Sequence, residues 1–141
     1  MFKTTVKYTD FLGEEREEIL RFNLTEVEMK DLMDEDPVFS PKFLTAISDD
    51  KDSDTMLRII RKLILHAYGE MSEDGRVFRK SEQITSDFAH SAAYTALLEK
   101  LFNSTDENYI SSFLIGIFPA KIAAALREEG ATTIPALKSA T

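Results

Sequence analysis

Apolar and polar side chains alternate in two runs at the start of the chain, in residues 2–9 and 19–24. A loop that contains Gly13 lies between the runs, and this pattern predicts a β-hairpin over residues 2–24. An isolated hairpin is only marginally stable in water, so its apolar face must lie on the rest of the chain. The residues expected on that face are Phe2, Thr4, Val6, Tyr8, Leu20, Phe22 and Leu24.

After residue 24, apolar residues recur at helical spacing. Thr25 and Glu28 form the T-x-x-E pattern of a capping box, which predicts a short helix that ends before Pro37. Ser40-Pro41 offers a second helix start, with proline at the first helical position.

The most apolar helical segment runs from residue 55 to residue 68. Its polar stripe is narrow, so we expect this helix at the centre of the fold, with Gly69 as its C-terminal cap. Residues 84–102 continue the helical spacing, as one long helix or as two joined near Ser91. A further helix is expected before Pro119, and a last one in AKIAAALREEG, closed by Gly130.

These segments predict an α+β fold that is mostly α. Residues 1–130 are expected to form a single globular domain, because the length suits one core and no boundary is visible. In that domain the hairpin of residues 2–24 packs on a bundle of five or six helices within residues 25–130. Residues 131–141 are expected to form a loose C-terminal tail.

The net charge of −8 limits the possible partners. Binding to nucleic acid or to an anionic membrane surface depends on lysines and arginines, so neither partner is expected. The sequence has no cysteine and no apolar run near the roughly 20 residues of a membrane-spanning helix. Its N-terminus shows no signal core, so we expect a cytosolic protein.

Candidate catalytic and metal-binding residues are weak. Asp50, Asp52 and Asp54 have the D-x-D-x-D spacing of a calcium loop, but the glycine and glutamate that complete such a loop are missing. His66 and His90 do not form a zinc motif, and we expect His66 to serve its helix end as a partly charged imidazole. We therefore predict no metal site, no cofactor and no enzymatic activity.

The segment HAYGEMSEDGRVFRK, residues 66–80, concentrates acidic, basic and glycine residues between two helices. Asp74-Gly75 is typical of a turn, Phe78 of an apolar anchor and Ser81 of a helix start. We interpret the segment as a joint that sets the angle between two helices, in which the basic residues neutralise the nearby acidic ones.

Three blocks of the sequence resemble a family of small proteins from long-tailed phages and prophages of Gram-positive bacteria, the tail assembly chaperones. The first block is similar to K-x-x-V-x-Y-T-D-F-x-G-x-E-R followed by F-N-L, and the second to A-Y-G-x-x-S-x-D-G-x-x-F-x-K-S. The third, FLIGIFPAK, is similar to F-x-x-G-I-x-P-K, with Ala120 inserted before Lys121. The matching residues are Lys3, Val6, Tyr8, Thr9, Asp10, Phe11, Gly13, Glu15, Arg16, Phe22, Asn23, Leu24, Ala67, Tyr68, Gly69, Ser72, Asp74, Gly75, Phe78, Lys80, Ser81, Phe88, Ala93, Tyr94, Phe113, Gly116, Ile117 and Pro119.

The resemblance implies a non-catalytic protein that binds the tape-measure protein and tail-tube subunits during tail assembly, with self-association also possible. It implies a location in the cytoplasm of the infected or lysogenic bacterium and absence from the mature virion. A helical domain can offer a groove to amphipathic helices, and our candidate contact residues are Phe118, Ile122 and Leu126. The alternative for these three residues is that they close the core.

Two other functions stay open at this point. One is a structural virion protein, such as a head–tail connector or tail-completion protein. The other is a host-directed inhibitor whose acidic surface imitates nucleic acid.

Overall fold

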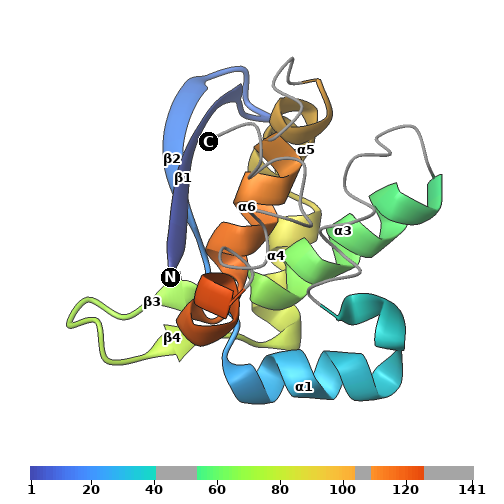
Figure 1. Cartoon of the computed structure of the whole chain (residues 1–141). Helices are drawn as coiled ribbons and strands as arrows, with labels where there is room; N and C mark the ends of the chain where they lie inside the picture. Colours follow the sequence, from blue (N-terminus) through green and yellow to red (C-terminus); the bar gives the residue numbers. More distant parts are fainter. Residues whose placement is uncertain (41–53, 104–108, 126–141) are drawn as a thin grey trace.

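The computed structural model describes residues 1–40, 54–103 and 109–125, which fold as a β-hairpin packed on helices (Figure 1). The predicted mostly helical α+β fold is confirmed. Five α-helices and a short 3₁₀ helix occur in these ranges, and residues 120–125 are also helical, as the predicted bundle requires. The elements are β1 (Phe2–Thr9), β2 (Glu15–Phe22), α1 (Glu26–Glu35), η1 (Pro37–Phe39), α3 (Asp54–Ala67), β3 (Glu70–Met71), β4 (Phe78–Arg79), α4 (Glu82–Ala89), α5 (Ala92–Phe102) and α6 (Tyr109–Ile117).

The first hairpin has the arrangement that the alternation predicts. Strands β1 and β2 are antiparallel, with Phe2 opposite Phe22. Val6, Leu20 and Phe22 are buried, because they lie on the face that covers the helices. Residues 11–19 are all exposed, so the distal half of the hairpin extends beyond the core.

The predicted helix boundaries agree with the observed caps. The capping box before α1 is complete, because the Thr25 hydroxyl accepts from the Glu28 N–H and the Glu28 carboxylate accepts from the Thr25 N–H. Ser91 caps α5 after α4 has ended, so the segment forms two helices rather than one. The helix start at Ser40-Pro41 reaches into residues outside the described ranges, and the predicted closure at Gly130 lies wholly outside them.

The helix at the centre of the fold is α6 and not α3, contrary to our prediction. Helix α3 buries one face but exposes Arg58, Arg61 and Lys62, whose charges must stay in water. Helix α6 carries no charged residue and lies between the hairpin and the other helices (Figure 1). Its buried residues are Ile110, Ser111, Phe113, Leu114, Ile115 and Ile117.

A cluster of aromatic rings joins the hairpin to the helices. Phe22 makes edge-to-face contacts with Tyr68, Phe88 and Phe113, at ring-centroid distances of 5.9, 6.2 and 5.5 Å. Tyr68 stacks on Phe88 at 3.7 Å. Burial, with smaller contributions from nearby Glu18 and other groups, raises the pKa of Tyr68 to about 12, so its phenol stays neutral.

The predicted domain limits reach beyond the described ranges. Residues 126–130 of the domain and the tail of residues 131–141 lie outside them, so both limits stay predictions.

Candidate protein-binding surfaces

The three predicted contact residues have different surroundings. Phe118 follows α6 and is only 4% exposed, as part of the core. Ile122 is partly buried against the same core, and Leu126 lies outside the described ranges. The positions of Phe118 and Ile122 are those expected of core-closing residues, while a contact with a partner is untested.

The acidic and histidine residues that we considered and rejected as metal ligands do not come together in the described part of the chain. Asp50 and Asp52 lie outside it, and Asp54 is the first residue of α3. His66 is on α3 and His90 follows α4, where its Nδ1 lies 2.7 Å from the Ser86 carbonyl oxygen. No group of three His, Asp or Glu side chains in the described ranges could hold a metal ion.

His66 does not have the partly charged ring that we expected. Burial lowers its pKa, and the positive charge of Lys62 lowers it further. The neutral imidazole is therefore favoured, so the helix end gains little from a charge on this ring.

The loop between β3 and β4 is a turn built by one carboxylate. The Asp74 carboxylate accepts from the Ser72 hydroxyl at 2.8 Å and from the Arg76 N–H at 3.1 Å. Gly75 has a positive φ of 76°, which suits glycine. Both bonds are to Asp74 Oδ1 and lower the pKa of Asp74, so the carboxylate supports the turn that we predicted.

Gly69 allows strand β4 to pack closely against it. It does not form the left-handed C-terminal cap that we predicted for the preceding helix. Its φ is not positive, and its N–H donates to the Arg21 carbonyl of β2 at 3.4 Å. A Cβ at this position would lie 2.6 Å from the Phe78 ring and 2.7 Å from the Arg79 carbonyl oxygen. The glycine is needed because β4 crosses directly over it.

Lys80 connects segments that are far apart in the sequence. Its Nζ donates to the Asn23 carbonyl at 2.6 Å and to the Glu28 carboxylate at 2.7 Å. Burial alone would raise the pKa of Glu28, but the bonds from Lys80 and from the Thr25 N–H outweigh it and lower that pKa. Lys80 thus holds the end of the hairpin and α1 against the start of α4, whereas we expected it to neutralise acids within its own loop.

A groove lies beside this contact, between α1, α3 and α4. It has a volume of about 600 Å³, and a smaller hollow of about 150 Å³ adjoins it along α1. Glu28 and His66 line both hollows. The surface of the larger one is mainly apolar, with Leu65 and Ala89 among its lining residues, and its charged lining residues are Glu28, Lys62, Lys80 and Glu82.

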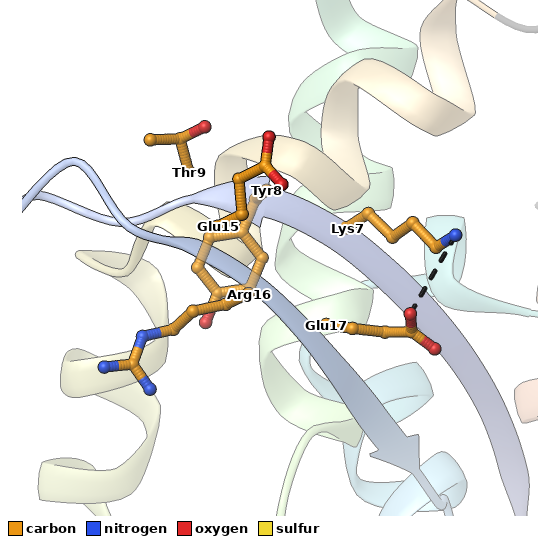
Figure 2. A pocket seen from close by; sticks show the side chains of 6 residues that line it. All are labelled: Lys7, Tyr8, Thr9, Glu15, Arg16 and Glu17. Atoms are coloured by element: carbon orange, nitrogen blue, oxygen red, sulfur yellow. Dashed lines mark ion pairs between the residues drawn. The ribbon is translucent and has the colours of Figure 1, made fainter.

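A second hollow, of about 490 Å³, follows the distal half of the hairpin. Figure 2 shows Lys7 and Glu17 extended toward each other, with Arg16 directed away from them. The Tyr8 hydroxyl donates to the Glu18 carboxylate at 3.4 Å, and burial and the charge of Glu18 raise the pKa of Tyr8. These polar side chains pair with one another across the two strands, so the hollow is a surface of the hairpin rather than an enclosed cavity.

The tip of the hairpin presents two large apolar side chains to water. Phe11 is 83% exposed and Leu12 is 84% exposed. The turn itself is well fixed, because the Asp10 carboxylate accepts from the Leu12 and Glu14 N–H groups and from Arg16 Nε. A fixed, exposed apolar tip is a candidate contact for another protein.

These surfaces define a class of protein: a helical domain with a projecting β-hairpin, suited to bind other polypeptides. The phage tail assembly chaperone family model matches residues 1–140, so the chain belongs to that family. No curated protein and no solved structure matches the chain significantly. None of the described helices is long and apolar enough to span a membrane.

Neither the groove nor the exposed tip of the hairpin was predicted from the sequence. The tip had a visible signal, because adjacent Phe11 and Leu12 precede Gly13 where polar residues usually form the turn. The groove had none, since its lining comes from segments more than 50 residues apart in the sequence, as Glu28 and Lys80 show.

Proposed function

We propose that this tail assembly chaperone binds the tape-measure protein and tail-tube subunits and keeps them apart from wrong contacts until the tail forms. The match of the family model to residues 1–140 carries the proposal. A chaperone of this kind acts in the cytoplasm of the infected or lysogenic cell and is absent from the finished virion.

The groove between α1, α3 and α4 supports binding of an amphipathic helix. Its volume of about 600 Å³ is in the range of sites that take several side chains. A helix can place apolar residues one turn apart against Leu65 and Ala89, while its polar face stays in water. The net charge of −8 keeps such a complex soluble.

Ile122 is a second possible contact for the same partner. It is partly exposed beside the core, whereas buried Phe118 could meet a partner only after local opening. The groove is therefore the better candidate, because its lining is accessible without a change in the fold.

Co-expression with the tape-measure protein of the same phage tests the proposal. The chaperone should move that protein from the insoluble to the soluble fraction and co-purify with it. Ala89→Glu should weaken this effect about tenfold or more, because an apolar helix would have to desolvate the new charge. Thr95→Glu is the control, since Thr95 is exposed on α5 and does not line the groove.

Failure of the wild-type chain to keep the tape-measure protein soluble would contradict the binding role. If Ala89→Glu and Thr95→Glu reduce the solubility of the tape-measure protein equally, the partner does not bind in the groove. Unfolding midpoints of both variants show whether each remains folded. Co-purification with tail-tube subunits tests the second partner in the same way.

Mass spectrometry of purified virions tests the location. We expect no chaperone in mature particles, and an amount comparable to structural tail proteins would instead favour a virion component.

A further inference from the structure

The outer edge of β2 has backbone groups that point away from its partner strand. The Asp10 N–H donates to the Glu14 carbonyl at 2.8 Å, and Asp10 stands opposite Glu14 when the strand register is continued to the turn. Hydrogen-bonded positions alternate along an antiparallel pair, so the even-numbered residues of β2 bond to β1. Odd-numbered residues then direct their N–H and C=O groups outward. The Arg21 carbonyl and the Asn23 N–H confirm this direction, because they bond to Gly69 and Ala67 outside the hairpin.

Residues 15–19 of this edge have no backbone partner in the part of the chain that the structure describes. Among the described residues, none bonds to the outward backbone groups of Glu15, Glu17 or Ile19. The edge of β1 is different, because it lies along α5 and the Lys100 ammonium donates to the Thr5 carbonyl at 3.1 Å. In Figure 1 β2 forms the side of the hairpin that faces away from α5.

The open edge continues an existing strand pairing. Tyr68 forms an antiparallel bridge with Phe22, so another segment of the same chain already pairs with this edge of β2 at its C-terminal end. The Asp10 carboxylate fixes the turn at the other end of the hairpin. The intervening backbone is thus held in the extended form that an added strand needs, which lowers the entropy cost of pairing.

The side chains along the edge determine which strand would fit. Glu15 and Glu17 lie on one face, where the exposed Lys7 ammonium of β1 is 3.9 Å from the Glu17 carboxylate. Arg16 and Glu18 lie on the other face, and Ile19 is 51% exposed at the end of the run. The same edge of a second copy would bring glutamates close to glutamates, which is unfavourable between neighbouring strands. Opposite charges would instead attract.

We propose that the β2 edge binds an extended basic segment of another protein by strand addition. Lysine or arginine would stand opposite Glu15 and Glu17, and an apolar residue opposite Ile19. At about 3.3 Å per residue, the open run takes a segment of about five residues, roughly 17 Å long. This binding mode is separate from the helix groove, so it goes beyond the proposed function and does not depend on it.

A peptide titration followed by NMR tests the proposal. The probe is a capped peptide in which Lys and Thr alternate and a Val ends the run, and the control peptide has Glu in place of Lys. The Lys peptide should shift the amide signals of Glu15, Glu17 and Ile19 and slow their hydrogen exchange. The amides of Arg16 and Glu18 should gain little protection, because they already bond to β1.

Two sets of variants connect the binding to this edge. Glu15→Lys with Glu17→Lys should weaken the Lys peptide about tenfold and make the Glu peptide the better ligand, because two attractive pairs become repulsive. Glu17→Pro removes one outward N–H from the edge and should reduce binding. Lys7→Pro is its matched control, since it removes an outward N–H from the opposite edge.

Three results would overturn the proposal. They are no binding of the Lys peptide at low millimolar concentration, shifts confined to the groove, or equal affinity for the two peptides. The first would mean that the glutamates only protect the edge from pairing.

Discussion

Replacing Gly116 by alanine should destabilise the fold, and removing the Phe2 ring should reverse that effect. A Cβ on Gly116 would lie 2.4 Å from Phe2 Cδ1 and 2.9 Å from Cε1. Carbon atoms in good contact are about 3.5 Å apart or more, so the ring would have to move by about 1 Å. Phe2 would then lose part of its edge-to-face contact with Phe113, now at a ring-centroid distance of 5.0 Å.

The magnitude follows from two opposing effects. Overpacking costs roughly 1–3 kcal/mol, whereas alanine is better than glycine in a helix by up to about 1 kcal/mol. We expect Gly116→Ala to lower the free energy of unfolding by about 1–2 kcal/mol. In a Phe2→Ala background the clash is absent, so the same change should raise that free energy by up to about 1 kcal/mol.

Urea unfolding of wild type, both single variants and the double variant measures the coupling between the two sites. We expect a coupling energy near 2 kcal/mol, from the difference between the two backgrounds. A coupling below about 0.5 kcal/mol would refute the reasoning, because independent sites are additive to that level.

Gly69 provides a contrasting case. A Cβ there would meet the Phe78 ring at 2.6 Å and also the Arg79 carbonyl oxygen at 2.7 Å. Truncating Phe78 removes only the first obstacle, since the carbonyl belongs to the backbone of β4. Gly69→Ala should therefore stay destabilising in a Phe78→Ala background, whereas Gly116→Ala changes sign in the Phe2→Ala background. A change of sign at Gly69 would contradict this account.

Two further predictions concern partly buried polar groups. Lys80→Met should destabilise the fold by about 1–3 kcal/mol, because Glu28 loses its main partner. Since the folded state lowers the pKa of Glu28 from its ordinary value of 4.5, that stabilisation is present above this pH and is lost as the pH falls through the lowered pKa. The difference between wild type and Lys80→Met in urea unfolding should therefore shrink in acid, and a constant difference would contradict the assignment. Tyr68 has a pKa raised from 10.0 to about 12, so stability should fall as the pH rises between these values, and Tyr68→Phe should reduce that fall in urea unfolding at alkaline pH.

Local signals predicted most of the secondary structure. The alternation in residues 2–9 and 19–24 predicted the hairpin, and Thr25 with Glu28 marked the start of α1, because these signals lie within short segments of the sequence. The roles of Gly69 and Lys80 were not predictable in this way. Gly69 is required by the path of β4, and Lys80 by an acid 52 residues earlier, so both depend on the assembled fold.

The binding surfaces were harder to predict for a related reason. Three helices must pack before the groove between them exists, and its lining residues have no common spacing in the sequence. Whether an edge of β2 is open depends on which other strands pair with it, and the sequence pattern of one strand does not show this. Only exposed Phe11 and Leu12 were visible as apolar residues in a turn.

The motif that resembles the tail assembly chaperones most closely consists of residues that stabilise the fold. In A-Y-G-x-x-S-x-D-G-x-x-F-x-K-S, Gly69 allows β4 to cross, Asp74 builds the turn and Lys80 holds α1. Ser81 caps α4 by accepting from the Ile84 N–H. Each of these residues acts within the chain, so the matching motif residues support the fold and do not identify a partner. Our two proposals therefore place partner recognition at accessible positions outside this motif, at Ala89 in the groove and at the glutamates of β2.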